Sequence, residues 1–258
     1  MNAIIVSDLH IGSRYFQFGV FERFMEKLPA DHELILNGDI IDSPYVKMDK
    51  SDQHALDMIK NISYRQPVVW VRGNHDNGYV PKAFGKASFK SSHRIGNRLL
   101  ITHGDGFDDI MPRSRLFIKA FRLMHNLRVK MGAKPVHVAE YAKKWKSFYR
   151  VLRKNVALNA VKCAAKNGFE AVVCGHTHYP EDLILHDIRY INTGAWTEFP
   201  AYYLQITAKD MVLNQVDPAF VSQRAESTLL NHHESEISFT DAPPQTAEAS
   251  QAYRGFAP

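Results

Sequence analysis

Residues 3–10 read Ala-Ile-Ile-Val-Ser-Asp-Leu-His, an apolar run followed at once by a carboxylate and an imidazole. The apolar run predicts a short buried strand. The D-x-H spacing turns both polar side chains to the same side of an extended chain. The same arrangement recurs at 171–178, where Ala-Val-Val-Cys is followed by Gly-His-Thr-His. Two strands far apart in the chain are therefore each expected to end in a pair of metal-binding side chains.

Strands alternate with helices in the first half of the chain, and the region after residue 168 is rich in strands. The predicted elements are strands at Ala3–Val6, Glu33–Leu36, Val68–Val71, Ala171–Cys174, Leu183–Leu185, Ile188–Ile191, Tyr202–Ile206 and Met211–Val216, helices at Phe18–Leu28 and Ala55–Ile62, and a hairpin at Arg94–Thr102 that turns at Gly96-Asn97. This pattern indicates an α/β protein whose sheets are covered by helices.

The composition excludes several classes of protein. The chain has 258 residues, of which 45% are hydrophobic and 23% charged, so it is not intrinsically disordered as a whole. Its two cysteines cannot build a disulfide framework, which fits a reducing compartment. No targeting segment and no apolar stretch long enough to span a bilayer is visible. We therefore expect a cytoplasmic protein, or one that is peripheral on the inner face of a membrane.

The net charge of +5 is unevenly distributed along the chain. Residues 112–167 carry 15 basic side chains and one acidic side chain, Glu140, a net charge of +14, so the rest of the chain carries −9. Apolar residues recur at helical spacing in two stripes, from Leu116 to Leu127 and from Tyr141 to Cys163. Such a basic helical segment is expected to face an anionic partner or an anionic membrane surface.

Five short motifs at the predicted strand ends carry the chemistry. They are Asp8-Leu9-His10, Gly38-Asp39, Gly73-Asn74-His75-Asp76, His103-Gly104-Asp105 and Gly175-His176-Thr177-His178. Together they supply carboxylate, amide and imidazole donors without thiolates, a mixture suited to Mn²⁺, Fe²⁺ or Zn²⁺ and poorly suited to Ca²⁺. Seven candidate ligands are more than one ion needs, which indicates two divalent metal ions that share a carboxylate.

These motifs, in this order, resemble the signature of the calcineurin-like metallophosphoesterase superfamily over about residues 1–216. The resemblance implies a four-layer αββα sandwich, in which two central mixed sheets lie between helices and a dinuclear site lies at one end. It also implies hydrolysis of a phosphate ester or a pyrophosphate by a metal-activated hydroxide. Among the candidate metals, Mn²⁺ is expected first.

The resemblance assigns a role to each motif residue. One metal would be held by Asp8, His10, His178 and a bridging Asp39, and the other by Asp39, Asn74, His103 and His176. His75 would act as the general acid. Asp42, three residues after Asp39, would orient His75, and Asp76 would serve as a local structural carboxylate.

The chain is most similar to the UDP-2,3-diacylglucosamine pyrophosphatase group of lipid A synthesis, which also carries a long insertion between the H-G-D and G-H-T-H motifs. Residues 1–217 are thus expected to form the catalytic domain, with a basic helical lid at about 107–167, and residues 218–258 a poorly ordered polar tail. The substrate would be an amphipathic nucleotide-lipid pyrophosphate contacted by Asn74, Arg14, Lys154 and Asn155. Best-known members of the group have Arg where this chain has His75.

Other functions compete with this reading. A phosphodiesterase or nuclease could use the same motifs, with the basic segment bound to nucleic acid. A protein phosphatase is disfavoured, because Ser43 follows Asp42 where that class has arginine. A small cyclic-nucleotide phosphodiesterase would have no use for so long a lid. A non-catalytic membrane-binding scaffold on the same fold is disfavoured by the intact set of ligands.

Overall fold

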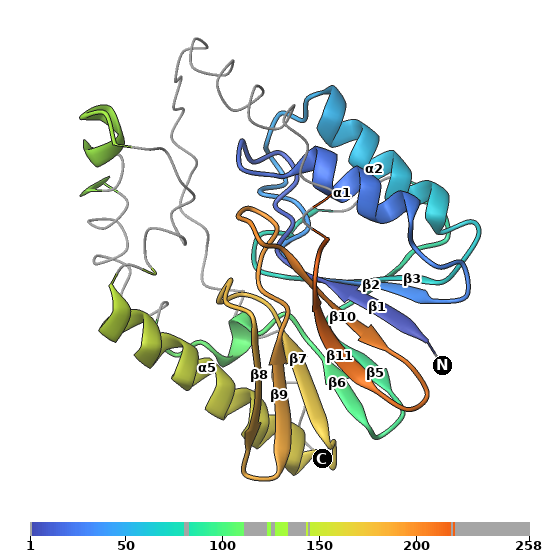
Figure 1. The fold of residues 1–258 in the computed structure, drawn as a ribbon, viewed down its shortest axis with the longest axis vertical. Coiled ribbons are helices and arrows are strands. Elements are labelled where there is room, and N and C mark those ends of the chain that lie inside the picture. Colours follow the sequence, from blue (N-terminus) through green and yellow to red (C-terminus); the bar gives the residue numbers. More distant parts are fainter. Residues whose placement is uncertain are drawn as a thin grey trace.

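The computed structural model describes residues 2–79, 83–110, 123–124, 127–133, 143, 145–217 and 219. Within them, eleven strands form two mixed sheets that lie face to face between helices (Figure 1). The six-stranded sheet has the order β11-β10-β1-β2-β3-β4, and the five-stranded sheet has the order β5-β6-β7-β9-β8. The strands are β1 (Ala3–Val6), β2 (Glu33–Asn37), β3 (Val68–Val71), β4 (Ser88–Lys90), β5 (His93–Ile95), β6 (Leu99–Ile101), β7 (Ala171–Cys174), β8 (Glu181–Leu185), β9 (Ile188–Asn192), β10 (Tyr202–Ile206) and β11 (Met211–Gln215).

Neighbouring central strands of each sheet pair in parallel. Antiparallel strands close both edges of the five-stranded sheet and one edge of the six-stranded sheet, whose other edge strand, β4, pairs in parallel with β3. Strand β1 pairs in parallel with β2, and β2 with β3, while β10 joins β1 antiparallel. In the other sheet β7 pairs in parallel with both β6 and β9. The carboxyl ends of parallel neighbours share one edge of a sheet, so the loops that follow β1, β2 and β3, or β6 and β7, begin side by side.

Alternating side chains of the central strands enter different cores. In β1, Ala3 and Ile5 pack between the sheets, whereas Ile4 and Val6 pack beneath the helices of the first sheet. In β7, Val173 packs between the sheets and Val172 packs on the opposite face. Three apolar cores separate four layers, which confirms the predicted αββα arrangement.

The outer layers are helical. Helices α1 (Phe18–Glu26) and α2 (Lys50–Ile62) cover the first sheet, and α5 (Lys146–Lys166) covers the second sheet (Figure 1). The carboxylate of Asp49 accepts from the backbone N–H of Asp52, and the Asp52 side chain accepts from that of Asp49. This capping box starts α2 five residues before the predicted Ala55, where apolar periodicity begins.

The carboxyl-terminal half of α5 packs on β7 and β9, although the sequence places it in the insertion. Its buried residues Ala157, Ala160, Val161 and Ala164 join Val172 and Tyr190 of the second sheet in one core. This half of α5 therefore builds the fourth layer of the sandwich. Most of the stripe from Leu116 to Leu127 and almost all of the tail at 218–258 lie outside the described residues. Among the described residues, no helix combines the length and apolarity needed to cross a bilayer.

Candidate metal centre

The five motifs lie in loops directly after β1, β2, β3, β6 and β7, and backbone hydrogen bonds join these loops. Asp8 N–H donates to the oxygen of Gly38 at 3.0 Å, and His10 N–H donates to that of Asp39 at 3.0 Å. Gly175 N–H donates to the oxygen of His103 at 2.8 Å. Backbone hydrogen bonding between neighbouring strands thus continues into the loops and fixes the motif residues relative to one another.

Seven of the predicted site residues form three overlapping clusters. Within each cluster one ligand atom per residue lies within 4.8 Å of the others, and the clusters are Asp8–His10–His178, Asp8–Asp39–His103 and His10–Asp42–His75. Oδ1 of Asp8 lies 3.2 Å from Nε2 of His178, and Oδ2 of Asp39 lies 3.1 Å from Nε2 of His103. All members except Asp42 and His75 are buried, so two carboxylates and three imidazoles are concentrated in a space shielded from water.

The site residues have an unusual backbone conformation. Asp8, His10, Asp39, His176 and His178 all have positive φ, between 50° and 63°. This left-handed conformation costs a non-glycine residue about 1–2 kcal/mol. Five such residues in one site indicate backbone strain held in place by the surrounding sheets, as is common at functional sites.

Glycines leave room for the carboxylates. A Cβ atom added to Gly73 would lie 2.3 Å from Oδ1 of Asp39, and one added to Gly175 would lie 2.2 Å from Oδ2 of Asp8. A Cβ on Gly38 would lie 2.5 Å from the His103 ring. The glycines of the G-D, G-N-H and G-H-T-H motifs therefore allow the backbone to approach the donor side chains.

Electrostatics in the cluster favour an ionised Asp39 beside a protonated His103. Burial alone would raise the pKa of Asp39, but the charges of His103, His75 and His10 and the hydrogen bond with His103 hold it well below its ordinary value. Burial would lower the pKa of His103, but Asp39 and Asp8 hold it well above the usual range. The pKa of His178, in contrast, is lowered by its burial, so in the absence of bound metal it is chiefly His103 that offsets the charge of the carboxylates.

These residues fit a pair of divalent cations. The donors are the oxygen and nitrogen types that such ions take. Nδ1 of His103 lies 3.0 Å from the main-chain oxygen of Asn37, and because a carbonyl only accepts, Nδ1 carries the hydrogen. Nε2 of His103 is buried and lies 3.1 Å from Oδ2 of Asp39, a proposed ligand itself. It is thus available to a cation that would replace its proton.

His75 and Asp42 lie together, but the contact differs from the predicted one. Nδ1 of His75 is 2.6 Å from the main-chain oxygen of Asp42. The Asp42 carboxylate instead lies 3.1 Å from Nδ1 of His10. The backbone N–H of His75 donates to Oδ1 of Asp39 at 2.8 Å, which ties the loop of His75 to the buried cluster.

Asp76 has the structural role predicted for it. Its carboxylate is buried and accepts hydrogen bonds from the backbone N–H groups of Ile40, Ile41 and Gly73 and from Nε1 of Trp70. These bonds join the loop after β2 to the loop after β3, so Asp76 holds the scaffold of the site.

The remaining predicted residues lie outside these clusters. Asn74 is exposed, and its side chain makes no hydrogen bond to a described residue. Nε2 of His176 lies 3.0 Å from Oδ2 of Asp108. Arg14 is exposed and donates to the hydroxyl of Tyr15, and Lys154 is exposed on α5. Asn155 accepts a hydrogen bond from the backbone N–H of Asp109.

Sequence reasoning missed two residues that hold the G-H-T-H loop from the side of α5. The hydroxyl of Tyr149 donates to the oxygen of Thr177, and Nζ of Lys143 donates to the oxygen of His178 at 2.6 Å. Lys143 also pairs with Glu198. The apolar stripe gave no signal for Tyr149, because the buried face of α5 follows Tyr149 and Leu152, whereas Phe148 is only half-buried.

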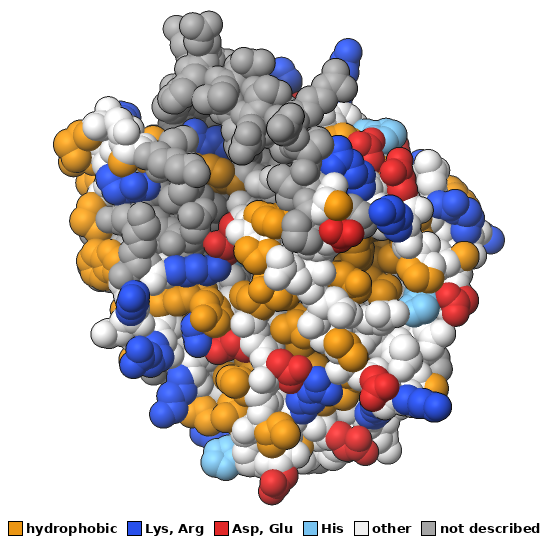
Figure 2. All heavy atoms as spheres, viewed as in Figure 1, with side chains coloured by type: hydrophobic (Ala, Val, Ile, Leu, Met, Phe, Trp, Pro, Cys, Tyr) orange, Lys and Arg blue, Asp and Glu red, His pale blue; other side chains and the backbone are white. Residues whose placement is uncertain are grey.

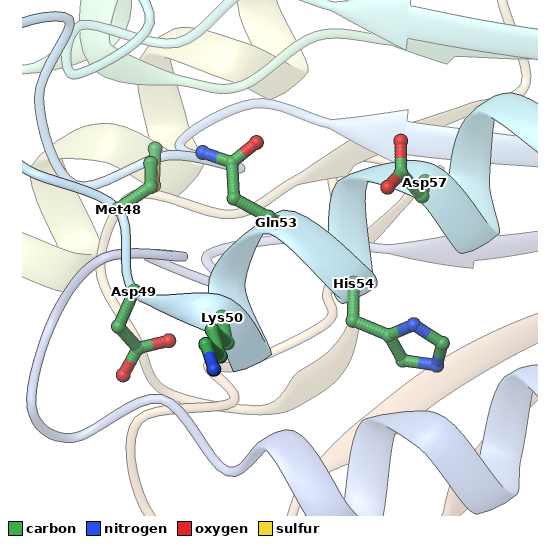
Figure 3. Close-up of a pocket in the computed structure, with 6 residues that line it drawn as sticks. All are labelled: Met48, Asp49, Lys50, Gln53, His54 and Asp57. Carbon is green, nitrogen blue, oxygen red and sulfur yellow. The ribbon is translucent and has the colours of Figure 1, made fainter.

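A shallow hollow of about 520 Å³ lies at the start of α2 and includes none of the motif residues. It is lined by Met48, Asp49, Lys50, Gln53, His54 and Asp57 (Figure 3). The side chains of Lys50, His54 and Asp57 extend from the same helix without converging on a common point (Figure 3). The chemistry therefore lies at the strand ends and not in this hollow.

Two mixed sheets between helices, with buried oxygen and nitrogen donors where the strands end, define an α/β metallohydrolase. The model of the calcineurin-like phosphoesterase family matches residues 1–180, and the chain belongs to this family. It is accordingly a metal-dependent hydrolase of phosphoric ester bonds, and members of the family typically depend on two metal ions.

Several solved structures are similar to this chain. The phosphoesterase Yfce from E. coli is 14% identical over 84% of this chain and 100% of its own, with a TM-score of 0.43. An archaeal phosphodiesterase is 14% identical over 83% of this chain and 99% of its own, with a TM-score of 0.43. The nuclease MPE from Pseudomonas putida is 15% identical over 82% of this chain and 87% of its own, with a TM-score of 0.39. No curated protein sequence matches the chain significantly.

Proposed function

We propose that the clusters hold two divalent cations, Mn²⁺ in the first instance. Asp8, His10 and His178 would hold one ion, His103, His176 and Asn74 would hold the other, and Asp39 would contact both. The contacts of Asp8 with His178 and of Asp39 with His103 support this division, because each carboxylate already faces an imidazole of its own group. Asn74, which is exposed, would complete the coordination of the second ion from the solvent side.

The chain's own residues would then bind the phosphate and move the proton. Bound divalent cations lower the pKa of water and neutralise charge on a phosphate. His75 is half-buried at the rim of the cluster, and its ring centroid lies 4.7 Å from that of His10. Since Nδ1 of His75 donates to the oxygen of Asp42, its Nε2 is the atom that would protonate the leaving oxygen.

We further propose that the substrate is a nucleotide-lipid pyrophosphate similar to UDP-2,3-diacylglucosamine. The observation that carries this proposal is a basic helix that contacts the site, together with apolar side chains that are exposed in the same insertion. Helix α5 contains six Lys or Arg residues and no Asp or Glu, and its Tyr149 contacts the G-H-T-H loop directly. Figure 2 shows Lys and Arg side chains gathered along the side of the molecule where α5 lies.

Apolar side chains are exposed in the described part of the insertion. Leu123, Leu127 and Met131 are 70%, 55% and 74% exposed. Their i, i+4 spacing is that of one face of a helix. Exposed apolar side chains and a basic helix in one insertion suit an amphipathic ligand, with acyl chains on the former and phosphates near the latter. The same surface suits an anionic membrane, and we propose that the protein works in the cytoplasm, peripheral on the inner face of the membrane.

A panel of substrates tests the proposed reaction. The Mn²⁺-loaded protein is given UDP-2,3-diacylglucosamine, a nucleotide diester, duplex DNA ends and a simple phosphate monoester, and the products are separated by chromatography. Release of UMP from the first substrate alone is the expected result. Cleavage of DNA in preference to the lipid would replace the proposal by a nuclease, to which the basic charge of α5 also points. Full activity after exhaustive chelation would overturn the metal mechanism.

Charge reversal tests the membrane proposal separately. Lys146, Arg150 and Lys154 are exposed on α5, so their replacement by Glu should weaken binding to vesicles that contain phosphatidylserine. The matched control reverses three exposed lysines elsewhere, Lys47, Lys50 and Lys209. Vesicle binding that falls equally in both variants, or in neither, would show that α5 is not the docking face.

A further inference from the structure

Asp108 places a buried carboxylate against one of the proposed ligands. It lies just after the short 3-10 helix η1 (Asp105–Phe107), and only 1% of its side chain is exposed. Its Oδ2 is 3.0 Å from Nε2 of His176. Its Oδ1 accepts a hydrogen bond from the backbone N–H of Ile110 at 2.9 Å. Oδ1 of Asp108 therefore binds the backbone of its own loop, and Oδ2 faces the ring of His176.

Helix α5 holds the loop that carries Asp108. Nδ2 of Asn159 donates to the oxygen of Phe107 and to Oδ2 of Asp109, both at 2.9 Å. Oδ1 of Asn155 accepts from the N–H of Asp109 at 3.2 Å. Three hydrogen bonds from two consecutive turns of α5 thus fix the backbone on both sides of Asp108, which sets the position of its carboxylate.

The contact decides which nitrogen of His176 can bind a cation. A carboxylate only accepts hydrogen bonds, so Nε2 of His176 carries the hydrogen and Nδ1 is left with the lone pair. We propose that Asp108 is a positioning residue that holds His176 in the Nε2–H tautomer and presents Nδ1 to the second metal ion. The proposal rests on the proposed dinuclear function and adds to it a residue outside the five motifs.

The backbone of His176 makes this orientation consequential. Its N–H donates to the carboxylate of Asp8, with both oxygens at 3.2 Å, and its ring centroid lies 5.5 Å from that of His103. The main chain of His176 is thus fixed by one proposed ligand and its ring lies beside another. What remains to be set is the rotation and tautomer of the imidazole, which the Asp108 carboxylate provides.

Replacing Asp108 by Asn separates this role from a merely structural one. Asparagine has one acceptor oxygen for two donors, the N–H of Ile110 and the Nε2–H of His176. If the oxygen stays with Ile110, the amide NH₂ faces Nε2 of His176 and favours the Nδ1–H tautomer, which blocks the ligating nitrogen. Asp108→Ala removes both interactions. Asp57→Asn, an exposed carboxylate on α2, is the matched control for the lost charge.

Two measurements on the same variants test the proposal. Long-range ¹H–¹⁵N correlation spectra of the metal-free protein at pH 8 report the tautomer of His176, and calorimetric titration with Mn²⁺ reports each binding event. We expect Nε2–H in the wild type and in Asp57→Asn, and a shift toward Nδ1–H in Asp108→Asn. Mn²⁺ affinity at one of the two sites should fall by about 10–100-fold in both Asp108 variants.

The outcomes are distinguishable. A wild type whose metal-free His176 is the Nδ1–H tautomer overturns the proposal without any variant, even if the variants do not fold. Wild-type Mn²⁺ affinity at both sites in folded Asp108→Asn and Asp108→Ala overturns it as well. A wild type that binds no Mn²⁺ overturns the proposed dinuclear function itself. The tautomer of His176 is measured in the metal-free protein, so it tests the role of Asp108 independently of that result.

Discussion

The imidazole of His75 is hydrogen-bonded to the backbone of Asp42 and not to its side chain. Nδ1 of His75 lies 2.6 Å from the main-chain oxygen of Asp42, while the Asp42 carboxylate lies 3.1 Å from Nδ1 of His10. The main-chain oxygen of Asp42 therefore accepts from His75, while its carboxylate faces His10. This division separates proton transfer from metal binding and makes the two roles testable by different substitutions.

Replacing His75 by Ala should lower turnover and leave the metals in place. His75 is not among the proposed ligands, and loss of a general acid costs about 10²–10⁴-fold in rate. The measurement pairs steady-state kinetics at saturating Mn²⁺ with metal content by elemental analysis. The control is His54→Ala, since the side chain of His54 is 57% exposed on α2. Loss of both metals from His75→Ala would show that His75 is a ligand.

Truncation of Asp42 should weaken metal binding and leave turnover at saturating metal nearly unchanged. Asp42→Ala removes the carboxylate that faces Nδ1 of His10 but keeps the main-chain oxygen that accepts from His75. Outer partners of ligating histidines typically contribute 10–100-fold to metal affinity, so Mn²⁺ should bind more weakly by about that factor. Turnover at saturating Mn²⁺ should then approach the wild-type value. A rate that stays low at every metal concentration would place the Asp42 carboxylate in the chemical step.

Metal binding should release protons at neutral pH. Although burial opposes it, the carboxylates of Asp39 and Asp8 hold the pKa of His103 well above its ordinary value, so we expect His103 to be protonated in the metal-free protein at neutral pH. Because the folded pKa is raised, the protonated form stabilises the metal-free fold below the unfolded pKa of about 6.5. That contribution disappears as the pH rises through the folded value.

A cation must displace that proton, so Mn²⁺ affinity should fall as the pH is lowered from 8 to 6. Calorimetric titrations at pH 7 in two buffers of different ionisation enthalpy measure the number of protons released. A binding enthalpy that is the same in both buffers would show that no proton leaves, contrary to the expected protonation of His103.

Much of the fold could be predicted from the sequence because the central strands are short apolar runs, of which β1, β3 and β7 are buried along their whole length. Ala3–Val6, Val68–Val71, Ala171–Cys174 and Tyr202–Ile206 were predicted with their observed bounds. Strand β4 was missed, because its three residues, Ser88–Lys90, include only one apolar side chain and are too few to show a pattern. Its pairing with β3 depends on its place beside the sheet and not on its own composition.

The candidate site was predictable as a set of residues, because its motifs follow strands whose carboxyl ends meet. The partners of those residues were not. Asp108 contacts His176 across 68 positions, and Tyr149 reaches Thr177 from α5 across 28. Such contacts depend on how α5 packs on the second sheet. The buried face of α5 could not be identified reliably either, since apolar side chains occur all around it, including the exposed Val151.

Two glycine-to-alanine substitutions should change stability in opposite directions, and only one of them should weaken metal binding. A Cβ on Gly175 would lie 2.2 Å from Oδ2 of Asp8 and 2.6 Å from Oγ of Ser7, both fully buried, so neither side chain can move away freely. We expect Gly175→Ala to displace the Asp8 carboxylate, to lower stability by about 1–3 kcal/mol, as for other overpacked sites, and to weaken Mn²⁺ binding.

Gly19 is the matched position, because it lies inside α1 and an added Cβ meets no atom within 4 Å. Alanine restricts the unfolded chain and favours the helix, so Gly19→Ala should raise the free energy of unfolding by about 0.4–1 kcal/mol. Urea unfolding and Mn²⁺ titration of both variants check the pair. If Gly175→Ala loses stability while its Mn²⁺ affinity stays at the wild-type value, Asp8 has not moved, and the glycine of the G-H-T-H motif serves packing alone.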